Sequence, residues 1–179
     1  MEQRQYNLNN GRVLLIREAT SEDARAVLEY VENSSGESDF LSFGPGEFDL
    51  TETEEAQVLR TYHDSDNQFY ILGLIDMTIV ASLSFSGGRR PRNRHSGEFG
   101  MSVQKAYWGR GIGSLMLDTL IDWAKKTRIV KKINLRVRTD NHRAIALYAR
   151  KGFVNEGTIR KAVFVDDRYF DHHCMGLEL

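Results

Sequence analysis

One stretch, residues 103–115, restricts the folds open to this chain more than any other. It reads VQKAYWGRGIGSL, with three glycines at alternate positions. The alternating segment 99–103 predicts a strand, and apolar residues at helical spacing after the glycines predict a helix. A glycine-rich turn between a strand and a helix gathers backbone N–H groups that no Cβ shields, and the helix dipole adds partial positive charge. We therefore expect an anion site, suited above all to a phosphate or pyrophosphate.

The glycine pattern does not match two common phosphate-binding motifs. A dinucleotide fingerprint needs glycine or alanine at the last place of G-x-G-x-x-G. That place holds Ser114 when counted from Gly109, and Met116 when counted from Gly111. The string G-x-x-x-x-G-K-[ST] of the ATP-type P-loop does not occur in the sequence. Taken alone, the stretch could also be a tight turn with no ligand, because lone glycine-rich turns are weak signals.

A second stretch, residues 141–153, carries another unusual pattern. It reads NHRAIALYARKGF and predicts a short helix that ends at Gly152. Asn141, Ala144 and Tyr148 lie at i, i+3 and i+7, so they share one helix face. An amide, a small residue and a phenol are an odd combination for a purely apolar core. The alternative is that Asn141 caps the helix and Tyr148 is a packed aromatic.

Together the two stretches resemble the GNAT superfamily of acyl-CoA-dependent N-acyltransferases. The family's loop motif, Q/R-x-x-G-x-G/A, corresponds to WGRGIG at 108–113, and its second motif, N-x-x-A-I-x-L-Y-x-x-x-G-F, matches 141–153 at every fixed position. The resemblance spans roughly residue 12 to the C-terminus. Trp108 stands where the family usually has Gln or Arg, so the loop would rely on backbone amides and on Arg110.

The resemblance implies acetyl-CoA as co-substrate and no metal. The loop amides would hold the pyrophosphate, the N–H of Met101 would donate to the thioester carbonyl as in an oxyanion hole, and Asn141 would bind the pantetheine arm. The implied cofactor-binding residues are Met101, Ser102, Val103, Trp108, Gly109, Arg110, Gly111, Ile112, Gly113, Ser114, Asn141, Ala144 and Tyr148.

The resemblance also suggests catalytic groups for acetyl transfer to a primary amine by direct attack in a ternary complex. Tyr148 is the expected general acid, because a phenol with a pKa of ~10 is protonated at neutral pH and can give its proton to the departing thiolate. Glu98 is a candidate base, acting through water. It lies one position from the family's usual glutamate, and Arg136 occupies the family's other base position. A structural role for Glu98 and a mechanism with water alone both stay open.

The loop 33–49 is the expected wall of the acceptor pocket. It is rich in turn-forming residues yet contains several aromatic side chains. We expect Glu37 or Asp39 to face an amine and Phe40 to line the pocket. The alternative is that the aromatic residues only pack the loop onto the core.

Composition narrows the remaining classes of function. A formal net charge of −1 argues against non-specific nucleic-acid binding. We therefore interpret the arginine-rich segment Arg89–Arg94 as a solvated hairpin tip. Contact of this segment with the adenosine 3′-phosphate or with an acidic partner stays open. The single Cys174 excludes an intrachain disulfide. No signal peptide or membrane-spanning run is visible, which predicts a cytoplasmic protein. Neighbouring residues His172 and His173 face opposite sides of a strand, which disfavours a metal site.

We expect one α/β (α+β) domain over residues 1–179, with its core from about residue 12. The predicted sheet is mixed, mostly antiparallel and six- or seven-stranded, with about four helices. The GNAT resemblance adds a central strand pair that splays at a bulge. The expected strands are 12–18, 69–75, 78–85, 97–103, 132–138, 153–164 and 169–177, with hairpin turns at Asp76–Met77 and Asp166–Asp167. A capping-box pattern at residues 51–54 predicts the start of a helix over residues 51–63. The expected function is an N-acetyltransferase acting on a small-molecule or protein amine. The alternative is a non-catalytic acyl-CoA sensor, and dimerisation through the last strands is plausible.

Overall fold

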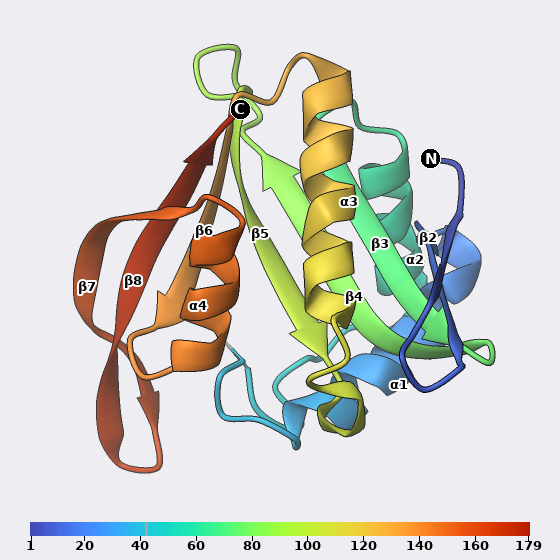
Figure 1. The fold of residues 1–179 in the computed structure, drawn as a ribbon, viewed down its shortest axis with the longest axis horizontal. Helices are drawn as coiled ribbons and strands as arrows, with labels where there is room; N and C mark the ends of the chain where they lie inside the picture. The colour runs from blue at the N-terminus through green and yellow to red at the C-terminus, as the bar shows by residue number, and fades with distance from the viewer. Residues whose placement is uncertain (42) are drawn as a thin grey trace.

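The computed structural model describes residues 1–41 and 43–179, and it is built around one open eight-stranded sheet (Figure 1). The strands lie in the order β1-β2-β3-β4-β5-β6-β8-β7, and β5 and β6 pair in parallel. The mixed sheet confirms the predicted class, with one strand more than expected. The strands are β1 (Arg4–Asn7), β2 (Val13–Glu18), β3 (Gln68–Ile75), β4 (Thr78–Gly87), β5 (Ser96–Val103), β6 (Lys132–Arg138), β7 (Val154–Val165) and β8 (Arg168–Glu178).

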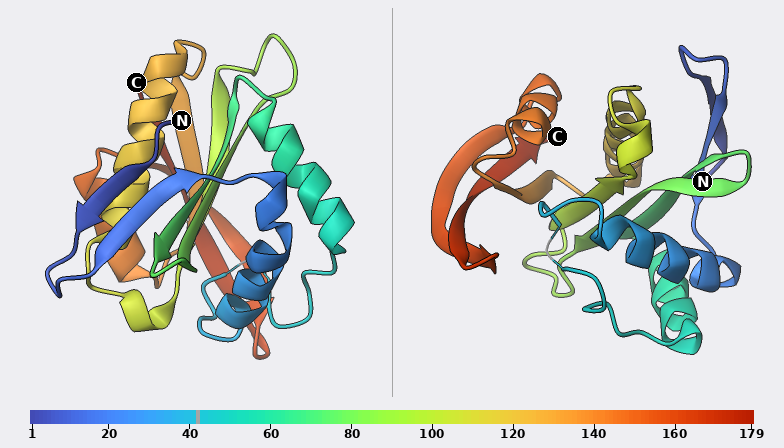
Figure 2. Two further views of the ribbon diagram at one scale, coloured as in Figure 1. Left: turned by 90° about the vertical axis from the view of Figure 1, so that its right-hand side faces the viewer. Right: turned by 90° about the horizontal axis from the view of Figure 1, so that it is seen from below.

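Helices cover both faces of the sheet (Figure 2). The helices are α1 (Ala24–Ser35), α2 (Glu52–His63), α3 (Ile112–Thr127) and α4 (His142–Arg150), with short 3-10 segments η1 (Ser21–Asp23) and η2 (Lys105–Tyr107). The view from below shows α1 and α2 on one side, and α3 and α4 on the other. Within the described residues, no helix is both long and apolar enough to cross a membrane.

Each face of the sheet has its own apolar core. On the α3 side, Met116, Leu117 and Leu120 are fully buried against the central strands, and Trp123 stacks on Phe69 with ring centroids 4.5 Å apart. On the other side, α1 and α2 pack on β3 and β4 around a second cluster that includes Val27. The apolar positions at i, i+3 and i+4 of α3 are those that an amphipathic helix turns towards a sheet.

Local signals fix the ends of several elements. The turns Asp76–Met77 and Asp166–Asp167 take positive φ at both central residues, as a two-residue hairpin of the I′ type requires. Both predicted hairpins are confirmed. At the start of α2, the Thr51 hydroxyl accepts from the Glu54 N–H while the Glu54 carboxylate accepts from the Thr51 N–H, which completes the predicted capping box.

The central strands β5 and β6 diverge along their length. They pair only from Ser96/Lys132 to Glu98/Asn134, and the rest of β5 leaves its neighbour (Figure 1). On its other side β5 stays in continuous register with β4 from Gly97 to Val103. The expected splay is therefore present. The bulge expected at this splay is absent from the β4–β5 ladder, which keeps its register without an inserted residue.

Candidate active site

A large cleft opens where β5 and β6 separate. Its volume is about 1360 Å³. It runs from the N-terminus of α3 to the segment that joins α1 and α2, so both faces of the sheet contribute walls. The predicted site residues that line it are Glu37, Phe40, Glu98, Met101, Ser102, Val103, Trp108, Gly109, Gly111, Ile112, Gly113, Ser114, Asn141, Ala144 and Tyr148.

The diverging half of β5 turns backbone N–H groups into the gap. The Gln104 N–H donates to the Val80 carbonyl at 3.0 Å, so Gln104 points its hydrogen-bonding groups at β4. These groups alternate along an antiparallel strand, and Met101 and Val103 therefore point theirs away from β4, towards the gap. The Val103 carbonyl accepts from the Trp108 indole at 2.6 Å, which agrees with this direction. Met101 thus presents an N–H to the cleft.

The glycine loop shapes the N-terminus of α3. Gly109 and Gly111 have φ of 80° and 82°, in the left-handed region where a Cβ is strained. The first helical bond runs from Leu115 N–H to the Gly111 carbonyl, at 3.1 Å. The N–H groups of residues 112–114 come before this ladder and project from the helix end. They form a cluster of donors at the positive end of the helix dipole, on the cleft wall.

Two arginines near the glycine loop, Arg110 and Arg143, make different contacts. Arg110 donates to the Ala106 carbonyl at 3.1 Å and lies over the Tyr107 ring, so it braces η2. Arg143, which the sequence analysis missed, lines the cleft and places its guanidinium carbon 5.1 Å from the centre of the Trp108 ring. Trp108 therefore tethers the loop to β5 through its indole N–H and packs beside a cation from α4.

Tyr148 lies in the cleft wall at a buried position. Its ring makes edge contacts with Phe99 and Phe153, with centroid distances of 5.8 and 6.0 Å. Burial raises the pKa of Tyr148 to about 12, which keeps the phenol protonated at neutral pH. Upstream on the same face, Asn141 caps α4 by accepting from the Ala144 N–H at 3.2 Å. The cap occupies Oδ1 of Asn141 and leaves its amide nitrogen for another partner.

Glu98 faces the α1 and α2 side of the sheet. It shares this face with Ser102, whose hydroxyl lies 2.9 Å from that of Tyr30 on α1. The Glu98 carboxylate accepts from the Arg136 guanidinium at 2.8 Å, in a half-exposed pair. His172 of β8 also lines the cleft, and burial followed by the charge of Arg136 lowers its pKa. The cleft thus contains both a paired carboxylate and an imidazole whose neutral form is favoured.

The predicted acceptor wall is tied to the rest of the fold at two points, one on η2 and one on β6. The Glu37 carboxylate accepts from the Lys105 N–H at 2.7 Å, which joins the end of α1 to η2. Arg138 is 6% exposed, donates to the Asp39 carbonyl at 2.8 Å and lies under the Phe40 ring, 4.8 Å from its centre. Ser42, within the same predicted loop, lies outside the described residues. Glu37 and Phe40 line the cleft, and both also hold the wall in place.

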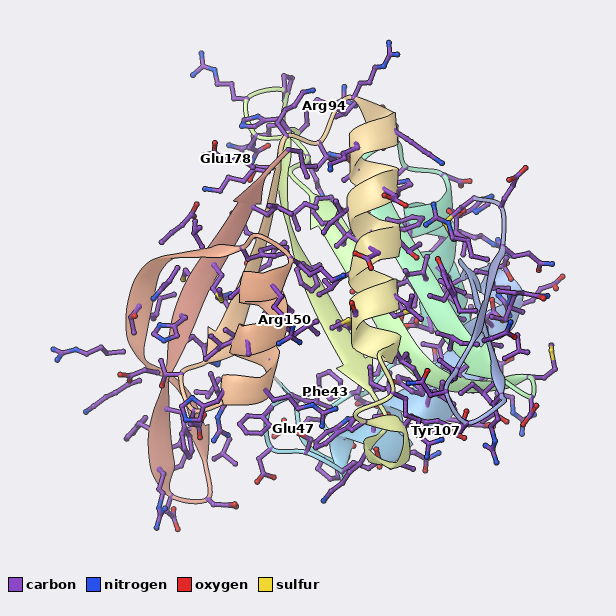
Figure 3. All side chains as sticks on the ribbon, viewed as in Figure 1. Phe43, Glu47, Arg94, Tyr107, Arg150 and Glu178 are labelled. Carbon is purple, nitrogen blue, oxygen red and sulfur yellow. The ribbon has the colours of Figure 1, made fainter. Side chains whose placement is uncertain are left out.

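The arginine-rich segment 89–94 does not line the cleft. Figure 3 labels Arg94 near the top of the view, and Phe43 and Tyr107 in its lower half. Arg94 pairs with Asp66 at 2.6 Å. This segment therefore contributes nothing to the cleft. Over the described part of the chain, no group of three His, Cys, Asp or Glu side chains is arranged to hold a metal ion.

Comparison with known proteins identifies a family and solved structures that share this architecture. The model of the acetyltransferase (GNAT) family matches residues 29–153. The crystal structure of a GNAT-family acetyltransferase from Streptococcus pneumoniae superposes with a TM-score of 0.91 at 33% identity, covering 93% of this chain and 99% of that one.

Two curated relatives match shorter segments. The L-amino acid N-acetyltransferase AaaT of Escherichia coli is 31% identical over 59% of this chain and 65% of its own. The ribosomal protein bS18-alanine N-acetyltransferase of Salmonella typhimurium is 44% identical over 35% of this chain and 41% of its own. The matched segments span less than two thirds of these curated relatives.

The fold shared with a solved GNAT-family acetyltransferase, together with the matched family model, defines the class as acetyltransferases. Within that class the chain belongs to the GNAT acetyltransferase family, because the family model covers most of its length. The resemblance inferred from the two sequence motifs is confirmed.

Proposed function

We propose that this protein is an N-acetyltransferase that moves the acetyl group of acetyl-CoA to a primary amine by direct attack in a ternary complex. The observation that carries the proposal is the direction of the Met101 N–H, which points into the gap between β5 and β6. A donor in that place can stabilise an oxyanion that develops on a carbonyl lodged in the gap. Helix-end amides and the buried Tyr148 phenol lie on the walls of the same cleft.

The residues present fit coenzyme A as a ligand. Gly109 and Gly111 leave open space where a Cβ would stand, so a diphosphate can approach the N–H groups of 112–114. Arg143 adds positive charge beside the loop. The amide nitrogen of Asn141 and the small side chain of Ala144 suit a pantetheine arm between β5 and α4. When bound, the cofactor would supply an acetyl group activated as a thioester.

Proton transfer is assigned to groups on the cleft walls. Tyr148 keeps its proton at neutral pH and can release it to a departing thiolate. The attacking amine must lose a proton, and Glu98 or His172 can accept it through water. His172 is favoured as neutral by burial, while Glu98 is held by Arg136. To decide between them, Glu98 and His172 are replaced one at a time, and the rate of thiol release is measured as a function of pH. The residue whose replacement changes the fall in rate at low pH is the proton acceptor.

The acceptor is an amine carried by a small molecule or by a protein. The curated relatives are named for an amino acid and for a ribosomal protein alanine, which supports both kinds of acceptor. The β7 edge of the sheet is exposed and could support a homodimer. Action in the cytoplasm, expected from the sequence, is part of this proposal, because amino acids and ribosomal proteins are both present there.

The test is release of free thiol from acetyl-CoA in the presence of a panel of amines. We expect thiol release that depends on the amine and gives one acetylated amine for each thiol. Tight binding of coenzyme A without turnover on any amine would instead identify a sensor of acyl-CoA, which was the alternative from sequence. Failure to bind coenzyme A would contradict both.

A further inference from the structure

A buried carboxylate on α2 has no role in the proposed chemistry. Glu55 is 2% exposed, although it belongs to the first turn of a helix whose other acidic residues face solvent. Among the described residues, its carboxylate forms no ion pair or hydrogen bond. Burial raises the pKa of Glu55, and no charged neighbour offsets that effect. An isolated carboxylate in such surroundings is costly unless something pairs with it.

Aromatic side chains from three segments line the same cleft as Glu55. They are Phe43, Phe48, Tyr62 and Tyr70, which belong to one apolar cluster on the α1 and α2 side of the sheet. Tyr62 and Tyr70 meet edge to face at 5.4 Å, and Phe43 lies 5.5 Å from Phe48. Burial and, to a smaller degree, the charge of Glu55 raise the pKa of Tyr70, which places the carboxylate near that ring. One anionic group among aromatic walls favours a cation.

Glu55 belongs to an element that packs two strands away from β5. Helix α2 packs on β3, and Tyr70 on β3 is opposite Ser84 on β4, which is opposite Gly100 on β5. Two strand spacings, roughly 9–10 Å, separate the β3 and β5 backbones. A Cβ at Gly100 would meet nothing within 4 Å, so the cleft is open along this line. The cation assigned to Glu55 is therefore treated as a group distinct from the nitrogen that attacks beside Met101.

We propose that Glu55 binds a second, positively charged group of the acceptor, so that the preferred substrate is a primary amine with a distal cation across an apolar spacer. This inference rests on the proposed acetyltransferase function and specifies its substrate class. The aromatic walls accommodate the spacer, and the carboxylate gains a partner that none of the described residues provides. Such a pair also discriminates against amines that end in an apolar group, because they leave Glu55 unpaired.

The experiment compares diamines with monoamines of equal length. Binding of 1,5-diaminopentane, 1,7-diaminoheptane, pentylamine and heptylamine is measured by calorimetry in the presence of coenzyme A. We expect at least one diamine to bind the unmodified protein about 10- to 100-fold tighter than its monoamine. Glu55→Gln should abolish this preference. Glu52→Gln, which removes an exposed carboxylate from the same helical turn, should leave it intact.

Three results would overturn the inference: equal binding of diamine and monoamine by the unmodified protein, a preference that survives Glu55→Gln, or equal loss in Glu52→Gln. Thermal unfolding checks that each variant is folded, and Glu55→Met serves as a second charge-removing variant. Thiol release is followed separately with the same amines. Turnover of monoamines without a diamine preference would contradict only the role of Glu55, whereas diamine binding without any turnover would contradict only the proposed function.

Discussion

At the scale of single residues, the proposed mechanism depends most on the phenol of Tyr148. Tyr148→Phe keeps the ring contacts with Phe99 and Phe153 but removes the proton donor. We expect the turnover number to fall about 10²-fold or more, with a smaller change in the Michaelis constant for acetyl-CoA. Initial rates of thiol release measure both constants. Tyr169→Phe, at an exposed hairpin position, is the control. Equal turnover in the Tyr148 variant and the unmodified protein would remove Tyr148 from the role.

The buried carboxylate of Glu55 predicts a dependence of stability on pH. Its pKa is raised above 4.5 in the folded protein. Between 4.5 and the folded pKa, the native state holds a proton that the unfolded chain has lost, so the free energy of unfolding falls as pH rises through this window. Urea unfolding at a series of pH values should show this decline in the unmodified protein and a flatter profile in Glu55→Gln. Parallel profiles for the two proteins would contradict the prediction.

Some of the residues that line the cleft could be predicted from the sequence, and others could not. Tyr148 and Asn141 were predicted to share a site, and both line the cleft, because they occupy fixed places in one helical motif. Glu55 sits among several acidic residues of an amphipathic helix, and only the packing of α2 on β3 buries it. Arg138 likewise looked like an ordinary charged residue of an alternating strand. In the fold, the strand order places it beneath the Asp39–Phe40 segment. Burial set by distant segments leaves no local sequence signal.

At the scale of secondary-structure elements, the junction between β5 and α3 depends on backbone conformation at Gly111. This residue caps α3 with φ of 82°. Gly111→Ala places a Cβ in the left-handed region, at a cost of roughly 1–2 kcal/mol, and should tilt the helix-end amides. We expect a lower melting temperature and an increase in the Michaelis constant for acetyl-CoA. Gly157→Ala, at an open position with ordinary φ, is the matched control. Equal effects of the two changes would show that the cap conformation does not matter.

Elements with strong local signals were predicted closely, and the others were not. The hairpin at Asp76–Met77 and the capping box at Thr51 follow from turn and cap chemistry within a few residues. Strand β1 was missed because its sequence, RQYN, lacks the apolar alternation of a strand, and it forms only as an edge on β2. The family resemblance correctly implied that β5 splays from β6. The bulge that it also implied was wrong, since β5 stays in continuous register with β4. Register depends on pairing between segments distant in sequence, so the sequence of one strand does not show it.

At the scale of the whole molecule, the two faces of the sheet divide the proposed work. The α3 and α4 face supplies the helix-end amides and the buried phenol, and the α1 and α2 face supplies the acceptor wall and Glu55. The opening between β5 and β6 connects the faces through the sheet. A donor and an acceptor can therefore enter from different sides and meet at Met101, which is the arrangement that direct transfer in a ternary complex requires.

Because the cleft walls come from both ends of the chain, ligand binding should stabilise the molecule as a unit. Coenzyme A at a hundred times its dissociation constant would add about 2.7 kcal/mol, equivalent to a rise in melting temperature of roughly 5–11 °C for a chain of this size. We expect one cooperative transition by calorimetry, shifted upward by coenzyme A. Gly111→Ala should show a smaller shift at the same ligand concentration. A separate, unshifted transition would show that part of the chain unfolds independently, against the expected single domain.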